Sequence, residues 1–227
     1  MRRWITVLIR RRKLHNHDFS ILCNRCIGGV MTHAVGERFR SPTVNLIIDD
    51  EAFLFFCEHV KEYAGAPVTA PNEEESRLLP KVRFPVGVLR GEDRDLPDIP
   101  LFFMHFKTLE DAIEKWDRRY RRINYEQICI MMDCKMHATE EFLDRFEKLP
   151  FERKVIFSHR EDPNRWPHNF RFSFYTKEKH RDGVLYRKTY RGLREAQAFE
   201  EFDYIQWLND GSVRRDNGDY SKECSCT

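Results

Sequence analysis

The sequence predicts an α/β fold in three layers, with a mainly parallel, mixed sheet covered by helices on both faces. Two kinds of segment alternate along the chain. In one kind the apolar residues are continuous or occupy every second position, and in the other they recur every three to four positions. Strands that alternate with helices in this way typically form a parallel sheet with both faces covered. The 227 residues are 41% hydrophobic and include 18 phenylalanines, which is enough apolar material for a packed core.

Seven segments have the composition of strands, and four have the periodicity of helices. The expected strands are residues 19–23, 44–48, 82–89, 101–105, 127–132, 155–158 and 170–175. The expected helices are residues 50–64, 109–122, 139–149 and 193–208. The clearest helix follows Thr108, which can cap its first turn, and carries an apolar stripe that includes Leu109, Trp116 and Ile123. Residues 65–80 and 160–169 contain prolines and read as surface loops.

We divide the chain into a basic N-terminal segment (1–16), a single α/β domain (17–209) and a polar C-terminal tail (210–227). The apolar stretch within residues 1–13 is far shorter than the ~20 residues that a membrane-spanning helix needs. We interpret it as a cationic amphipathic segment that makes peripheral contact with anionic lipid. The alternative is a surface helix whose arginines face water.

Charge and cysteine content narrow the class of protein. Lys and Arg number 39 against 37 Asp and Glu, and this formal charge of +2 does not support a nucleic-acid partner. Cys23, Cys57 and Cys129 lie in apolar runs, which is typical of reduced core thiols. We therefore expect a cytoplasmic protein, and we assign no metal ligand.

Residues 24–29, Asn-Arg-Cys-Ile-Gly-Gly, directly follow the first predicted strand. Because glycine has no Cβ and tolerates positive φ, Gly28 and Gly29 predict backbone N–H groups that stay open to bind an oxyanion or a phosphate. The spacing fits neither a Walker loop nor a G-x-G-x-x-G motif. The alternative is an ordinary strand-to-helix turn with a buried cysteine.

Three residues are the main candidates for catalysis, and His33 is a weaker fourth. Cys26 would begin a helix, whose dipole lowers the pKa of a thiol as a nucleophile requires. His105 ends a predicted strand and is the candidate base, with His33 as a weaker candidate. Asp133 follows another predicted strand at the same edge of the sheet, where it could orient a histidine. For each histidine the alternative is a packing or backbone-bonding role.

The candidate ligand-binding residues are polar groups, glycines and a histidine near the ends of predicted elements. They are Asn24, Gly28, Gly29, His33, Ser41, Thr43, Arg119, Arg122 and Asn124. Planar guanidinium groups bind carboxylates and phosphates through paired hydrogen bonds, so the arginines suit an anionic ligand. The alternatives are a solvated helix face for the arginines and a plain turn for the hydroxyls.

Several motifs occur in an order that is typical of one bacterial family. They are residues 19–29, Ser41-Pro42-Thr43, Phe84-Pro85-Val86-Gly87, residues 103–107, Glu114-Lys115-Trp116, Arg118-Arg119, Arg122-Ile123-Asn124 and residues 202–209. Through them the chain resembles domain of unknown function 1919 over residues 17–209. The resemblance implies a part in exopolysaccharide or capsule biosynthesis and supplies no reaction. Arg25, Ile27 and residues 134–137 depart from the family's pattern.

We therefore expect an enzyme that transfers an acyl or glycosyl group to a sugar or nucleotide-sugar precursor, and of the two reactions we favour acyl transfer. The donor stays open between an acyl-coenzyme A and a nucleotide-sugar. The alternative is a non-catalytic accessory protein that binds a sugar or nucleotide, for which residues 171–175 and 186–190 offer aromatic and basic side chains. Convergence of Cys26, Asn24, His105 and Asp133 on one cleft would favour the enzyme. A buried Cys26 with His105 pointing away from it would favour the accessory protein.

Overall fold

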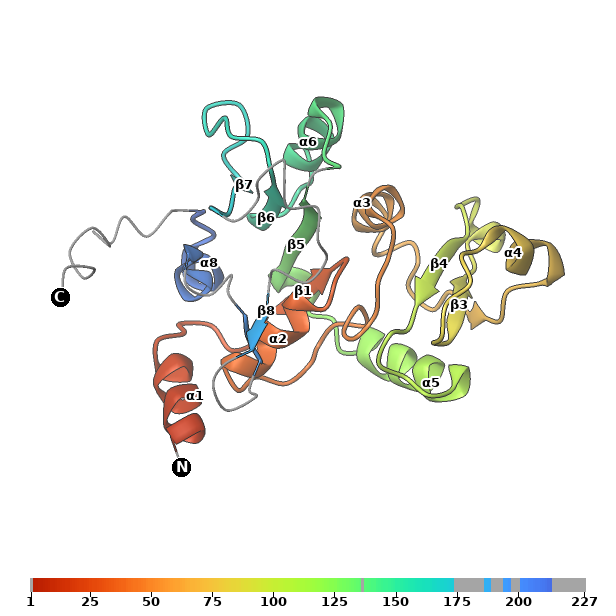
Figure 1. Cartoon of the computed structure of the whole chain (residues 1–227), viewed down its shortest axis with the longest axis horizontal. Helices are drawn as coiled ribbons and strands as arrows, with labels where there is room; N and C mark the ends of the chain where they lie inside the picture. The colour runs from red at the N-terminus through yellow and green to blue at the C-terminus, as the bar shows by residue number, and fades with distance from the viewer. Residues whose placement is uncertain (1, 136, 174–185, 189–193, 197–200, 214–227) are drawn as a thin grey trace.

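The computed structural model describes residues 2–135, 137–173, 186–188, 194–196 and 201–213. Its centre is a four-stranded parallel sheet, sheet A, in which the strands take the order β1-β5-β6-β7 (Figure 1). The strands are β1 (Ser20–Cys23), β5 (Ile128–Lys135), β6 (Arg153–Ser158) and β7 (Asn169–Phe170).

Helices cover both faces of sheet A, because alternate residues of each strand point to opposite sides. Leu22 of β1 and Ile130 of β5 join one core, which includes side chains of α3 (Asp50–Glu58) and α6 (Glu140–Glu147). Ile21 and Met131 join the other core, with α2 (Ile27–Ala34) and α8 (Tyr204–Asp210). The predicted three-layer α/β architecture is confirmed.

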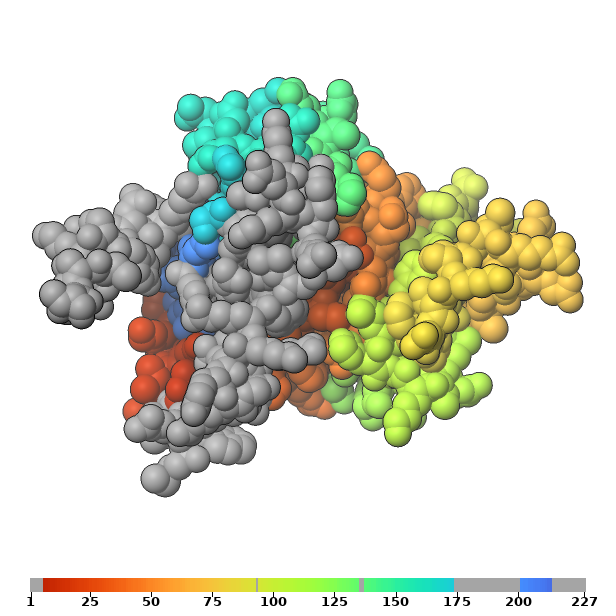
Figure 2. Space-filling model, in the orientation of Figure 1, coloured from red at the N-terminus to blue at the C-terminus, as the bar shows by residue number. Residues whose placement is uncertain are grey.

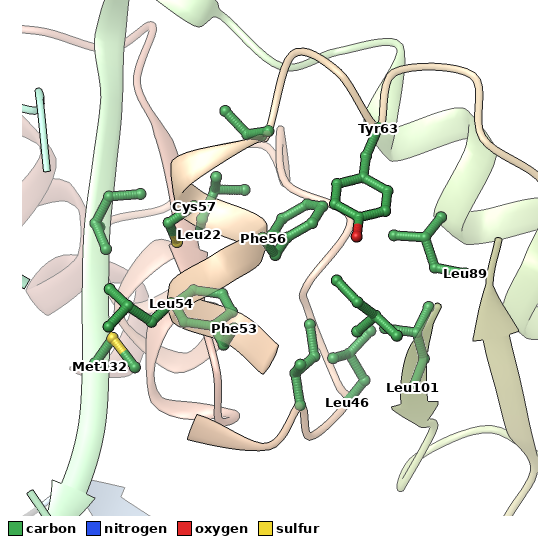
Figure 3. Packing of buried hydrophobic residues seen from close by; sticks show 14 of the residues in the cluster. Leu22, Leu46, Phe53, Leu54, Phe56, Cys57, Tyr63, Leu89, Leu101 and Met132 are labelled. Atoms are coloured by element: carbon green, nitrogen blue, oxygen red, sulfur yellow. The ribbon is translucent and has the colours of Figure 1, made fainter. Parts of the chain in front are cut away.

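A second sheet, sheet B, is antiparallel and contains β2 (Val68–Thr69), β3 (Val86–Leu89) and β4 (Ile99–Phe102) in that order. Helix α5 (Leu109–Tyr120) packs on this sheet. Its Leu109 side chain lies so close to Gly87 of β3 that a Cβ on this glycine would be 3.2 Å from Leu109 Cδ1. Figure 3 shows α3 between β5 and the strands of sheet B, with Phe53 and Phe56 in the shared core. Sheet B and α4 (Glu73–Leu78), yellow in Figure 2, extend from the body of the molecule.

The expected strand at residues 44–48 is wrong. Asn45 takes a left-handed φ of 70°, which asparagine tolerates and which interrupts the extended run. Ile47 makes an isolated antiparallel bridge to Phe102 of β4, and Ile48 N donates to Asn24 O at 3.1 Å. The segment therefore joins the open edge of β1 to sheet B.

Other boundaries also differ from the expectations. Residues 193–208 do not form one helix: β9 (Arg194–Ala196) pairs antiparallel with β8 (Tyr186–Lys188), and α8 begins after the capping side chain of Asp203. The expected loop 65–80 contains β2 and α4. The end of the last expected strand, residues 174–175, and tail residues 214–227 lie outside the described residues.

The remaining elements are the N-terminal helix α1 (Arg2–Arg12) and two 3-10 turns, η1 (Glu92–Arg94) and η2 (Tyr125–Gln127). Helix α1 packs at the end of α2, where a Cβ on Gly36 would come within 2.7 Å of Val7 Cγ1. Within the described part of the chain, no helix has the length and apolar character to cross a bilayer.

Candidate functional site

The loop after β1 is closed, so the expectation of open amides is wrong. A Cβ on Gly28 would lie 2.7 Å from Cys23 Cβ, and one on Gly29 would lie 3.0 Å from Val44 Cγ1. Both glycines are buried, and the N–H groups of Arg25 and Gly28 approach the Cys23 sulfur. The glycines therefore serve close packing of α2 on β1, and their amides do not line an anion site.

Cys26 is half-buried at the N-cap of α2, and it lacks the lowered pKa that we expected. Burial raises the pKa of its thiol, and the nearby Arg25 offsets this only in part. The C-x-x-C spacing of Cys23 and Cys26 is a signal that sequence reasoning missed. It does not mark a reactive pair, because burial raises the pKa of Cys23 to about 12.

The two histidines do not meet Cys26. His105 is exposed in the turn after β4, in sheet B, and His33 is exposed in the last turn of α2. None of the hydrogen bonds among the described residues joins either ring to the cysteine. The antiparallel pairing of β4, which the sequence did not reveal, is the reason that His105 lies away from the carboxyl edge of sheet A.

Asn24, by contrast, holds this edge together. Its side chain is fully buried; Oδ1 accepts from Asp133 N at 2.9 Å, and Nδ2 donates to Asp133 O at 3.3 Å and to Asp50 Oδ1 at 2.8 Å. A single amide thus joins the end of β1, the end of β5 and the start of α3. Asp133 itself is buried beside it.

The hydroxyls of Ser41 and Thr43 are also buried, and both accept hydrogen bonds from backbone N–H groups. Thr43 Oγ1 accepts from Cys23 N at 2.9 Å, and Ser41 Oγ accepts from Thr43 N at 3.2 Å. Because β1 is the edge strand of sheet A, Thr43 satisfies an N–H that no neighbouring strand reaches.

Arg119 and Asn124 form hydrogen bonds with other parts of the chain. Asn124 binds residues at the amino end of β1, where its N donates to Ser20 Oγ at 2.9 Å and its Nδ2 to Asp18 O at 2.8 Å. Arg119 donates to Val44 O at 3.1 Å and lies over the ring of Phe39. Asn124 therefore lies at the amino end of sheet A, whereas Asn24 lies at its carboxyl edge.

A cavity of about 400 Å³ opens at the carboxyl edge, beside the closed loop. It is lined by Arg25, Asp49, Asp50, Glu51, Cys134, His137, Ala138 and Phe142. These residues follow β1 and β5 and begin α3 and α6, which is where ligands bind in open α/β sheets. Within the part of the chain that the structure describes, no three His, Cys, Asp or Glu side chains are arranged to hold a metal ion.

Asp50 is the central charged group of this cavity. Its Oδ1 accepts from Asn24 Nδ2 at 2.8 Å and from Arg25 Nη2 at 3.1 Å, and the Cys134 thiol bonds to the same side chain. Burial raises the pKa of Asp50, and the bonds from Arg25 and Asn24 offset this only in part. A positioned carboxyl group with a raised pKa in a pocket is suited to accept and donate protons.

Sequence reasoning missed Asp50, Arg25 and His137. Asp49-Asp50-Glu51 starts a helix, and acidic residues in a first helical turn are common, so they gave no distinct signal. Arg25 lay inside the motif that we singled out, yet only its neighbours were chosen. Asp50, Arg25 and His137 come together only because α3 packs against the ends of β1 and β5.

Comparison with known proteins places this chain among its relatives. The model of the family described as domain of unknown function (DUF1919) matches residues 1–209. The chain belongs to this family. A Haemophilus influenzae protein named only as an uncharacterized protein is 29% identical over 202 residues, which cover 88% of each chain. The family match ends at Asn209, where we ended the α/β domain, and it includes the basic segment 1–16 that we set apart.

Proposed function

We propose that this family member is a transferase that acts on a sugar or nucleotide-sugar precursor in the Asp50 cavity, and that glycosyl transfer is its reaction. The observation that carries the proposal is the Asp50 carboxylate, which accepts hydrogen bonds from Asn24 and Arg25 in a cavity that also contains the guanidinium group of Arg25; burial there raises its pKa. The acyl-transfer alternative has less support, because Cys26 has a raised pKa and no histidine partner.

In the proposed step, a hydroxyl of the acceptor sugar attacks the anomeric carbon of a nucleotide-sugar. The new glycosidic C–O bond forms as the bond to the diphosphate breaks, and the nucleoside diphosphate leaves. Asp50 takes the hydroxyl proton, and Arg25 binds the diphosphate charge. Activity then rises with pH through the pKa of Asp50, because only the carboxylate accepts a proton.

The biological setting that we propose is exopolysaccharide or capsule assembly, as the family resemblance of the sequence implies. We also propose a cytoplasmic location. It is supported by the five cysteines of the described residues, which are free thiols and of which four are buried.

A second proposal is a non-catalytic accessory protein that binds the same sugar or nucleotide. It is supported by the half-buried position of Cys26 and by the exposed His105, in line with the criterion set out above. The aromatic stretch 171–175 adds little to it, because Phe172 is buried in the core and Arg171 pairs with Glu161 at 2.9 Å. The side chains of residues 186–190 lie outside the described residues.

The test combines thermal shift with turnover, using uridine-diphosphate hexoses and acetyl-coenzyme A as probes. We expect the nucleotide-sugar to raise the melting temperature of the wild type and Arg25→Ala to remove this shift. Asp50→Asn keeps the shift and lowers turnover by about 10²–10⁴-fold, whereas the exposed control Glu74→Gln changes neither.

Each other outcome decides between the alternatives. A shift without turnover in the wild type supports the accessory protein. A rise in melting temperature with acetyl-coenzyme A alone supports acyl transfer in place of glycosyl transfer. If neither probe raises the melting temperature, both the transferase and the accessory protein are excluded at this cavity.

A further inference from the structure

Helix α1 has two sides with opposite surroundings. Val7 lies against Gly36, Arg11 Nε pairs with Glu37 Oε1 at 3.2 Å, and Leu14 just beyond the helix is buried. These positions recur every three to four residues, so they share the side that packs on the body of the protein.

The other side exposes apolar residues. Leu8 and Ile9 are 54% and 51% exposed, and they are adjacent, whereas the other exposed large apolar side chains of the described residues lie in different elements. Arg12, one turn beyond Leu8, is also exposed. A surface helix normally buries its apolar side chains, so the two adjacent exposed ones indicate that something covers Leu8 and Ile9.

Positive charge surrounds this helix. The last three residues of α1 are Arg10, Arg11 and Arg12, and Lys13 comes next. Arg38 directly follows Glu37, which pairs with Arg11. Further along the surface, Arg38 and Arg40 lie close enough to Arg122 to lower its pKa, although desolvation contributes most to that shift. Because the whole chain carries a formal charge of only +2, this concentration of arginine is local.

We propose that α1 docks on an anionic lipid bilayer, with Leu8 and Ile9 inserted at the interface and the surrounding arginines facing lipid headgroups. Charge complementarity selects this occupant, since a basic amphipathic helix binds through its buried apolar area together with attraction to anionic lipid. A second copy of the chain is disfavoured, because a symmetric contact would bring the arginines of two copies together. Figure 1 shows α1 at the periphery of the molecule, beside α2.

The membrane contact is independent of the proposed reaction, because α1 contributes no residue to the Asp50 cavity. Helix α1 also lies inside the region that the family model matches. Failure of one proposal therefore leaves the other standing.

Flotation of the full chain with lipid vesicles tests the inference. We expect binding to phosphatidylcholine vesicles with about 30 mol% phosphatidylglycerol to be at least ten-fold stronger than binding to pure phosphatidylcholine. The double variant Leu8→Glu, Ile9→Glu should lose at least ten-fold in vesicle binding, and Arg38→Glu about five-fold or more. Raising salt from about 0.1 to 0.5 M should weaken the wild type.

The control is Leu78→Glu, which changes another apolar side chain, 81% exposed, in the acidic helix α4. It should bind vesicles as the wild type does, and circular dichroism should confirm that every variant folds. Absence of wild-type binding to the anionic vesicles, or equal binding by the double variant, would overturn the proposal. A dimer in light scattering that the double variant abolishes would overturn it in favour of a second copy.

Discussion

Two carboxylates of this protein each bind an arginine, yet their pKa values move in opposite directions. Asp50 bonds to Arg25 in the cavity at the edge of sheet A, and its pKa is raised. Glu75 bonds to Arg90 on sheet B, and its pKa is lowered. The difference lies in what surrounds each pair.

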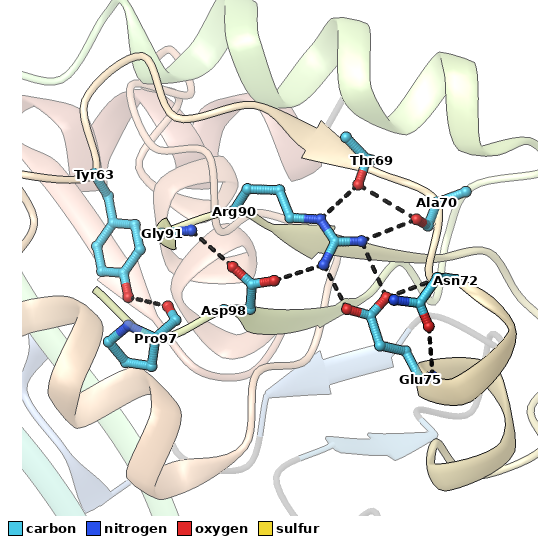
Figure 4. Close-up of polar contacts among 9 residues, drawn as sticks. All are labelled: Tyr63, Thr69, Ala70, Asn72, Glu75, Arg90, Gly91, Pro97 and Asp98. Atoms are coloured by element: carbon cyan, nitrogen blue, oxygen red, sulfur yellow. Dashed lines mark hydrogen bonds and ion pairs between the residues drawn. The ribbon is translucent and has the colours of Figure 1, made fainter. Parts of the chain in front are cut away.

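The carboxylate of the Arg90 cluster is the more exposed of the two, since the Glu75 side chain is 27% exposed and that of Asp50 is 16% exposed. Figure 4 shows Arg90 bonded to Glu75 and Asp98, to the Thr69 hydroxyl and to Ala70 O, while Glu75 also forms a capping box with Asn72. Hydrogen bonds from Arg90 are the largest influence on Glu75, because water still solvates the carboxylate.

At Asp50 the loss of solvent is the larger influence. Desolvation outweighs the attraction of Arg25 and the bonds from Asn24 and Cys134. An arginine partner alone therefore does not identify a functional carboxylate; the combination of burial, fixed hydrogen bonds and an adjoining cavity does. Three variants can break or sharpen this comparison.

The largest effect is expected from Asn24→Ala. The substitution leaves Asp133 N and O without their buried partner and removes one bond to Asp50, so we expect the free energy of unfolding to fall by about 3 kcal/mol. Urea unfolding measures it. The exposed control Asn164→Ala should stay within about 0.5 kcal/mol of the wild type. A loss of equal size in the two variants would show that Asn24 does not hold this edge.

The Asp50→Asn variant tests the direction of the pKa shift, and we expect it to change the free energy of unfolding less than Asn24→Ala does. The pKa of Asp50 in the folded state is above the ordinary 3.8. At pH values between these two pKa values, the native state therefore binds more protons than the unfolded state. Stability of the wild type should therefore fall as pH rises from about 3.8 through the folded pKa. Urea unfolding across this range should show less of this fall in Asp50→Asn. Parallel curves for the two proteins would contradict the shift.

The smallest effect is expected from Arg90→Ala, with a melting temperature about 1–3 °C lower at neutral pH, because solvent screens the pairs of this arginine. The lowered pKa of Glu75 means that its contribution is present above the ordinary 4.5 and is lost as pH falls through the folded pKa. Calorimetry should thus find the difference from wild type shrinking in acid. The matched control Arg77→Ala removes a more exposed pair, with Glu73 at 3.7 Å, and should change little.

Local signals predicted much of the fold. The Thr108 hydroxyl accepts from Asp111 N and that of Thr139 from Phe142 N, so both helix starts were predicted from the residues around them. The apolar runs of β1, β5 and β6 were found because they are buried on both faces. Residues 44–48 had the same apolar composition, but one left-handed residue, Asn45, changed their role.

The candidate site was harder to predict. The sequence singled out the loop after β1, and its Asn24 and Arg25 both form hydrogen bonds at the edge of sheet A. It did not reveal that Gly28 packs on Cys23 or that His105 belongs to a second, antiparallel sheet. Each of these depends on contacts between segments whose pairing no local pattern encodes.

The sequence by itself determined the elements whose causes are local: caps, periodic apolar stripes, buried strands and the basic helix at the N-terminus. Only the tertiary structure decided which polar groups meet. Asn24 reaches Asp50 across 26 positions and Asp133 across 109, and these contacts form the site. The physical reason is that burial, which raises the pKa of Asp50, is a property of packed neighbours and not of the residue itself.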